Sequence, residues 1–208
     1  MYEYNFSAKI GDKTISCRAF TLEEYLNLIT AKNNGKLKGA VQELIKNCTS
    51  AKDLNKQEAE LLLVHLWSQS LGEVNHENTW KCTCGHESKV YINLLHTRID
   101  DSDDLWYTLG DIKLKLRYPE LFDDENVAEM IVKCMESVYS NGENININDL
   151  NEREINDLYA YITEQDVVNI KELLLKPTVN LSLPVKCEAC GENHIHTLRG
   201  LKDFFEIM

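Results

Sequence analysis

Four short segments from the first part of this chain recur, in the same order, in its second part. Within each pair the apolar and polar residues are spaced alike, and the offsets are 99, 86, 96 and about 105 residues. The pairs are residues 11–18 with 110–117, 41–48 with 127–134, 53–58 with 149–154, and 81–85 with 186–191. Because chance matches would fall in any order, this colinearity indicates an internal duplication. The alternative is that the segments share only local propensity.

The duplication predicts an α+β fold made of two related halves, residues 1–98 and 99–208. Each half is expected to contain a β-hairpin, several helices and one turn that carries a cysteine pair. The acidic run 100–104, interrupted only by Ser102, is the expected joint between the halves. With 208 residues and 43% hydrophobic residues, the chain has the composition of a folded globular protein rather than a disordered one.

Hydrophobic periodicity places the elements of the first half. Alternating polarity over residues 3–9 and 13–18 predicts a hairpin. Thr21 and Glu24 then form a capping box that begins a helix. The predicted buried face of this helix consists of Leu22, Tyr25, Leu26 and Ile29. Two further helices and a polar stretch lead to the first cysteine pair.

The second half repeats this plan with changes. A hairpin is expected over about 105–117, followed by a helix and the polar loop 141–148. Thr163 and Asp166 cap an additional helix, and alternating residues then lead into the second cysteine pair. The face of the helix that follows the hairpin is predicted to comprise Val127, Ile131, Cys134 and Val138.

Four of the seven cysteines lie in two tight pairs, each followed by glycine. Two thiolates on a sharp turn form a zinc knuckle, and two knuckles make a closed site of four sulfurs. The paired spacing therefore predicts a structural zinc ion held as in a split zinc ribbon. The predicted ligands are Cys82, Cys84, Cys187 and Cys190, with His86, His194 or His196 as substitutes.

Other interpretations of the cysteine pairs remain open. The turns could be metal-free, with reduced thiols, or they could form a redox dithiol. Thioredoxin-like chemistry needs C-x-x-C at the start of a helix, whereas β-patterned sequence follows each pair here. A catalytic zinc ion is disfavoured because four protein ligands leave no open position for water.

Outside the cysteine pairs, no group of residues has the spacing of a catalytic or phosphate-binding motif. His65 is interpreted as a residue on the flank of a helix, without a neighbouring partner that would make it a base. The remaining cysteines are expected in the core, and three aromatic residues are candidates for either core packing or interface anchors. These residues are Cys17, Cys48 and Cys134, and Trp80, Trp106 and Tyr107.

The charge balance limits the partners of this chain. There are 22 basic and 34 acidic residues, giving a net charge of −12, which repels a phosphate backbone. Nucleic acid is therefore not expected as a partner. The sequence also has neither an apolar run long enough to span a membrane nor a recognisable signal peptide, so no membrane partner is expected.

The opening of the chain and its cysteine turns resemble those of a known family. The hairpin ends in Cys17-Arg18-Ala19-Phe20-Thr21, the sequence Leu22-Glu23-Glu24-Tyr25-Leu26 follows, and C-x-C-G and C-x-x-C-G turns come later. In these features, and in its length and acidity, the chain resembles the baseplate hub assembly proteins of T-even-type tailed bacteriophages. The resemblance implies a late viral protein without enzymatic activity that helps to assemble the hub of the tail baseplate.

Two roles follow from this resemblance. In the first, the protein is an assembly factor or chaperone that binds baseplate hub proteins in the cytoplasm of the infected host cell. In the second, it is a permanent structural subunit of the hub in the virion. A zinc-ribbon protein that binds nucleic acid is a further alternative. The residues that contact the partner and the oligomeric state are not identified by the sequence.

Overall fold

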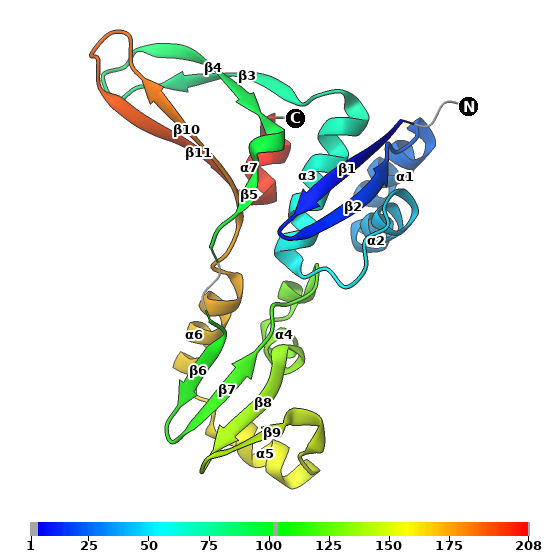
Figure 1. Ribbon diagram of the computed structural model, residues 1–208, viewed down its shortest axis with the longest axis vertical. Coiled ribbons are helices and arrows are strands. Elements are labelled where there is room, and N and C mark those ends of the chain that lie inside the picture. Colours follow the sequence, from blue (N-terminus) through cyan, green and yellow to red (C-terminus); the bar gives the residue numbers. More distant parts are fainter. Residues whose placement is uncertain (1–3, 102–103, 208) are drawn as a thin grey trace. The chain divides into compact units, whose positions relative to one another are not determined.

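The computed structural model divides the chain into two compact units (Figure 1). The first unit comprises Met1–Asp100 and Thr178–Met208, and the second comprises Asp101–Pro177. The predicted second half, residues 99–208, is therefore not one compact unit. The reason is that the chain after residue 178 contributes apolar side chains to the core of the first unit and pairs with a strand of that unit.

The structure describes residues 4–101 and 104–207. Parts of three predicted segments consequently lie outside the described residues. These parts are residue 3 of the first hairpin, residues 102–103 of the acidic run, and residue 208 of the C-terminal tail.

The first unit combines helices with short antiparallel sheets. The strands β1 and β2 form one hairpin, β3 and β4 form a second, and β10 pairs with both β11 and β5. The elements are β1 (Asn5–Ile10), β2 (Lys13–Arg18), α1 (Leu22–Asn33), α2 (Leu37–Cys48), α3 (Lys56–Leu71), β3 (Asn75–Lys81), β4 (Glu87–Asn93), the 3-10 helix η1 (Leu94–His96), β5 (Arg98–Ile99), β10 (Val179–Lys186), β11 (Asn193–Arg199) and α7 (Gly200–Ile207).

Helix α3 is the centre of the first unit. Leu62 and Leu66 lie on one face of the helix and Val64 lies on the opposite face, yet all three are completely buried. A helix that is apolar on all sides must be covered on all sides. Figure 1 shows the β1–β2 hairpin beside α3, and the same core includes residues of β4, β10, β11 and α7.

Helix α1 begins as predicted but presents a different face to the core. Thr21 and Glu24 form the expected capping box. Leu28 is buried, whereas Leu22 is 73% exposed and Leu26 is 54% exposed, so the predicted face was wrong for these two residues. The orientation follows from Tyr25, whose ring packs against two aromatic rings of the first unit. Those rings belong to Phe20, at 6.1 Å, and Trp67, at 5.7 Å.

The second unit is a four-stranded antiparallel sheet with three helices. The strand order is β6-β7-β8-β9, and residues of all three helices share one core with the sheet. The elements are β6 (Trp106–Leu109), β7 (Ile112–Leu116), the 3-10 helix η2 (Asp123–Glu125), α4 (Val127–Cys134), β8 (Met135–Ser140), β9 (Glu143–Asn146), the 3-10 helix η3 (Ile147–Asp149), α5 (Glu152–Tyr161) and α6 (Glu164–Leu175).

Two expectations for the second unit need correction. Helix α4 ends at Cys134, so Val138 lies on strand β8 rather than on the helix face. Part of the predicted polar loop, residues 143–146, is the edge strand β9. Val138 continues the apolar spacing of the helix but also fits a strand, and its pairing with β7 decides in favour of the strand. The polar residues 143–146 form a strand because they pair with β8 at the edge of the sheet.

Together, the two units make the fold α+β, with helices and small antiparallel sheets in each. None of the helices in the described part of the chain has the length and apolar character required to cross a lipid bilayer.

Candidate metal centre

The two cysteine pairs lie at the tips of two hairpins of the first unit. The β3–β4 hairpin carries Cys82 and Cys84, and the β10–β11 hairpin carries Cys187 and Cys190. Both turns are closed by a hydrogen bond from the backbone N–H of the first cysteine, at 2.8 Å in one turn and 2.9 Å in the other. Both also need a glycine with positive φ. These glycines are Gly85, with φ of 90°, and Gly191, with φ of 75°.

The four predicted ligands form one cluster, here called the four-cysteine cluster. The Sγ atoms of Cys82 and Cys190 are 3.7 Å apart, as are those of Cys84 and Cys187. All four Sγ atoms lie within 4.8 Å of one another. A disulfide needs a sulfur separation of about 2 Å. In a tetrahedral zinc site with Zn–S bonds of about 2.3 Å, neighbouring sulfurs are about 3.8 Å apart.

The residues present therefore fit a structural zinc ion. Cys82 and Cys187 are buried, while Cys84 and Cys190 are exposed, so the cluster lies at the surface of the first unit. Four thiolates would complete the coordination of zinc and leave no position for a reacting water molecule. Such a site holds parts of the chain together and does not carry out catalysis.

The local backbone favours the thiolate form of Cys187, whereas at Cys190 in the same turn the lowering effect of the backbone at Glu192 is outweighed by desolvation and the neighbouring thiols, which raise the pKa of Cys190 to about 12. The backbone N–H of Cys190, together with that of Ala189, lowers the pKa of Cys187 to about 6, against the opposing effect of desolvation. A thiolate is the form of cysteine that binds a metal.

Of the predicted histidine substitutes, the structure brings one to the sulfurs. The Nε2 atom of His194 lies 3.4 Å from the Sγ atom of Cys82. His194 also forms a group with Cys190 and Glu192 whose ligand atoms lie within 4.8 Å of one another. His86 and His196 belong to neither group of potential ligands among the described residues.

The sequence analysis did not connect Trp80 with the metal centre. In the structure the ring of Trp80 packs against the ring of His194, with centroids 5.1 Å apart. The sequence gives one indication that Trp80 lies near the metal centre: it precedes the first cysteine by two residues and is therefore close to that turn. No spacing rule pairs it with His194, which is 114 residues further along the chain.

The other cysteines and His65 lie in the core. Burial raises the pKa of Cys17 and Cys48 to about 11 and that of Cys134 to about 12. All three side chains are buried, which confirms their interpretation as core residues, and their thiols stay protonated near neutral pH. His65 is only 7% exposed, so its placement on a helix flank was wrong, and burial lowers its pKa to about 4.

The two other aromatic candidates lie in the second unit. Trp106 is 39% exposed, with the ammonium group of Lys115 at 5.1 Å from its ring centroid. The hydroxyl of Tyr107 donates a hydrogen bond to Asp166 at 2.7 Å, and its ring packs against the core of that unit.

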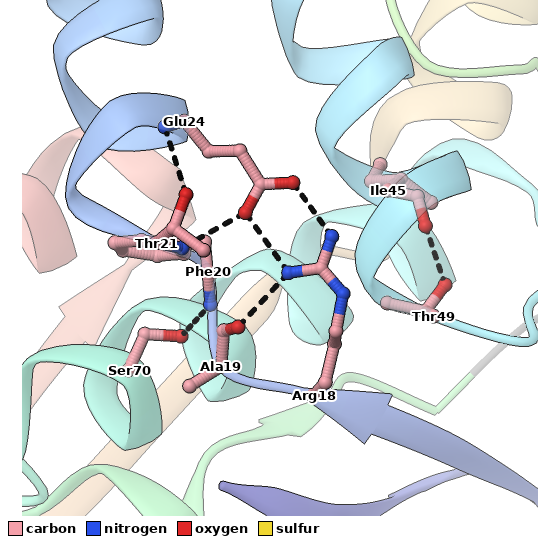
Figure 2. Close-up of polar contacts among 8 residues, drawn as sticks. All are labelled: Arg18, Ala19, Phe20, Thr21, Glu24, Ile45, Thr49 and Ser70. Atoms are coloured by element: carbon pink, nitrogen blue, oxygen red, sulfur yellow. Dashed lines mark hydrogen bonds and ion pairs between the residues drawn. The ribbon is translucent and has the colours of Figure 1, made fainter. Parts of the chain in front are cut away.

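The opening motif has a structural role (Figure 2). The guanidinium of Arg18 donates to both carboxylate oxygens of Glu24, at 2.9 and 2.6 Å, and to the carbonyl of Ala19 at 3.1 Å. Glu24 also accepts a hydrogen bond from the backbone N–H of Thr21 at 2.8 Å. Arg18 is the dominant cause that lowers the pKa of Glu24 to about 2. The motif thus fixes the junction between strand β2 and helix α1.

These features define a class: a two-unit α+β protein whose distinctive site is a four-cysteine cluster of structural rather than catalytic geometry. The chain belongs to the T4 bacteriophage base plate protein family, which it matches over residues 1–206. It is 64% identical, over 208 residues that cover the whole of both chains, to the baseplate hub assembly protein gp26 of Enterobacteria phage T4. The family resemblance in the sequence is thereby confirmed. No solved structure matches the chain.

Proposed function

We propose that this protein is a non-enzymatic assembly factor for the central hub of a phage tail baseplate. It acts by binding hub proteins in the cytoplasm of the infected host cell. The observation that carries the proposal is the identity of 64% over the full length of a baseplate hub assembly protein. The four-cysteine cluster supports it, because its closed donor set stabilises a scaffold and leaves no site for a substrate.

A permanent place in the virion is the second candidate, and the description of the family as a base plate protein favours it. One experiment separates the two roles. A phage from which this gene is deleted is propagated with and without the gene supplied from a plasmid, and hub complexes and finished particles are purified. An assembly factor is required for hubs to form but is absent from finished particles, whereas a structural subunit is present in them at fixed stoichiometry. Normal hubs in its absence would refute both roles.

A structural zinc ion is the proposed cofactor, with Cys82, Cys84, Cys187 and Cys190 as ligands. The separations of 3.7 Å between sulfurs support it. Elemental analysis of protein purified without chelator is expected to give about one zinc per chain. Cys84→Ala should abolish binding, whereas Glu188→Ala, a change at an exposed residue between the two cysteines of the other turn, should not. Equal metal content in both variants would contradict this ligand set.

Internal duplication is the proposed origin of the two sequence halves, residues 1–98 and 99–208. Two contacts support it. Cys17 of the first hairpin forms a bridge with Thr49, which follows helix α2, and Leu116 of the second hairpin pairs with Met135, which follows helix α4. The offsets between these positions are 99 and 86 residues, the same as those of the surrounding sequence matches.

The helices that follow are also related by a constant offset. Asn55 and Glu58 form the capping box of α3, and Asn151 and Glu154 form that of α5, both pairs separated by 96 residues. Under this proposal, the β10–β11 hairpin is the counterpart of β3–β4, and the metal centre joins one knuckle from each copy.

A further inference from the structure

Backbone N–H groups act on sulfurs in both knuckles of the four-cysteine cluster; in the first knuckle, that of His86 acts on the sulfur of Cys84. In the second knuckle, the backbone N–H groups of Cys190 and Ala189 act on the sulfur of Cys187. The first knuckle has one spacer residue instead of two. The described contacts of the Cys82 sulfur outside the cysteines are with two side chains. These are His194, at 3.4 Å from Nε2, and Thr83, at 3.9 Å from Oγ1.

His194 comes from the opposite hairpin and is held in a fixed orientation. It lies on β11, where it pairs with Val185 of β10. Its ring packs against Trp80 of β3, with centroids 5.1 Å apart and planes at 51°. Its side chain is 22% exposed. The ring therefore lies between the two hairpins, and Nε2 lies nearer to the Cys82 sulfur, at 3.4 Å, than to the carboxylate of Glu192, at 3.7 Å.

A hydrogen bond at this position has a clear physical role. Zinc with four thiolates is a doubly negative centre, and N–H donors to the sulfurs disperse that charge and orient the ligands. A metal-bound thiolate offers no proton, so the neighbouring Nε2 must carry the hydrogen. The 3.4 Å separation between Nε2 and Sγ fits such a bond.

We infer that His194 is a positioning residue of the metal centre: it donates its Nε2–H to the Cys82 thiolate across the two hairpins. This bond gives the Cys82 sulfur of the shorter knuckle a side-chain donor that comes from the other hairpin. The inference rests on the proposed zinc site and adds to it a residue that is not a ligand. It also explains why the ring that packs on Trp80 is a histidine, since phenylalanine would make the same stacking contact.

Three variants test this role in the full-length, zinc-loaded protein. His194→Phe keeps a ring against Trp80 but removes the donor, His194→Gln keeps an N–H donor, and His86→Phe is the control beside the other knuckle. Zinc affinity is measured by competition with a chromophoric chelator. Loss of a hydrogen-bonding partner of a ligand lowers metal affinity by about 10- to 100-fold. We expect about a 10-fold loss for His194→Phe, and changes of less than about 3-fold for His194→Gln and His86→Phe.

The Co²⁺-substituted protein distinguishes a hydrogen-bond donor from a ligand. Thiolate-to-cobalt absorption typical of four sulfurs should persist in all three variants. Loss of a nitrogen ligand in His194→Gln, seen as a change in the ligand-field bands, would overturn the inference. So would a zinc affinity of His194→Phe equal to that of the unmodified protein, or an equal loss of thermal stability in its metal-free and zinc-loaded forms. If the unmodified protein binds no zinc, the proposed site itself fails, a result distinct from any of these.

Discussion

Replacing Glu24 by glutamine tests whether the ion pair with Arg18 stabilises the junction between β2 and α1. The side chains of Arg18 and Glu24 are 24% and 20% exposed, so the pair is partly shielded from solvent. Arg18 is the main cause that lowers the pKa of Glu24 from 4.5 to about 2. At about 1.4 kcal/mol for each pKa unit, this difference corresponds to about 3 kcal/mol of folding free energy.

The direction of the pH dependence follows from the lowered pKa. The unfolded chain takes up a proton on Glu24 near pH 4.5, but the folded chain does so only near pH 2. The contribution is therefore complete above about pH 5 and is lost as the pH falls toward 2, with about 2 kcal/mol lost by pH 3. Glu24→Gln should destabilise the protein by about 2–3 kcal/mol at pH 7 and by less than about 1 kcal/mol at pH 3.

The assay is urea unfolding of the unmodified protein and the variant at both pH values. The matched control is Glu23→Gln, which removes the exposed neighbouring carboxylate in the same first turn of α1. That control should change stability by less than about 0.5 kcal/mol. If the two variants are equally mild, or if the effect of Glu24→Gln is the same at pH 7 and pH 3, the reasoning about the ion pair is wrong.

Three further predictions concern buried groups. Leu28→Ala should lower the free energy of unfolding in urea by about 2–4 kcal/mol, and Leu26→Ala by less than about 0.5 kcal/mol. The reverse order would mean that Leu26, as expected from the sequence, is the buried residue of the helix. Burial lowers the pKa of His65 to about 4, so between about pH 6.5 and 4 the unfolded chain binds a proton that the folded chain does not, and stability decreases as the pH is lowered. His65→Gln should reduce this pH dependence in thermal melts; an unchanged dependence would mean that another group causes it. Iodoacetamide followed by mass spectrometry should leave the buried Cys48 unmodified in the folded protein, and should modify the exposed Cys190 only after metal removal; labelling of Cys190 with zinc bound would argue against its being a ligand.

Local signals in the sequence were sufficient for most elements. The capping boxes at Thr21 and Thr163 have the hydrogen bonds that their residue types imply. Features settled by tertiary contacts were less predictable. Leu26 fits the apolar face of an isolated helix as well as Leu28 does, and only the packing of Tyr25 against other rings determines which of them is buried.

The metal centre shows the same division between local and long-range information. The four cysteines could be predicted as one cluster because their spacing carries the chemistry of a knuckle. His194 could be proposed only as a substitute ligand, because sequence spacing does not give the direction in which a ring points. Its contact with the Cys82 sulfur depends on how two hairpins from distant parts of the chain meet.

The return of residues 178–208 to the first unit has a physical basis at Asp100. The backbone N–H of Asp100 donates to the carbonyl of Thr178 at 3.0 Å, and the Asp100 carboxylate accepts hydrogen bonds from the side chains of Thr178, Asn180 and Arg199. The chain thus leaves and re-enters the first unit at one point.

A zinc ion joining Cys82 to Cys187 would close a loop of about 100 residues, a constraint worth about 5 kcal/mol in the chain-entropy estimate for a cross-link of that length. The hydrogen bonds at Asp100 already close most of that loop in the native state, but only a cross-link that persists in the unfolded chain gains this entropy. Under the proposed zinc site, the stabilisation would therefore come mainly from binding the folded arrangement of the two hairpins, and the inferred bond of His194 between those hairpins would then contribute to metal affinity.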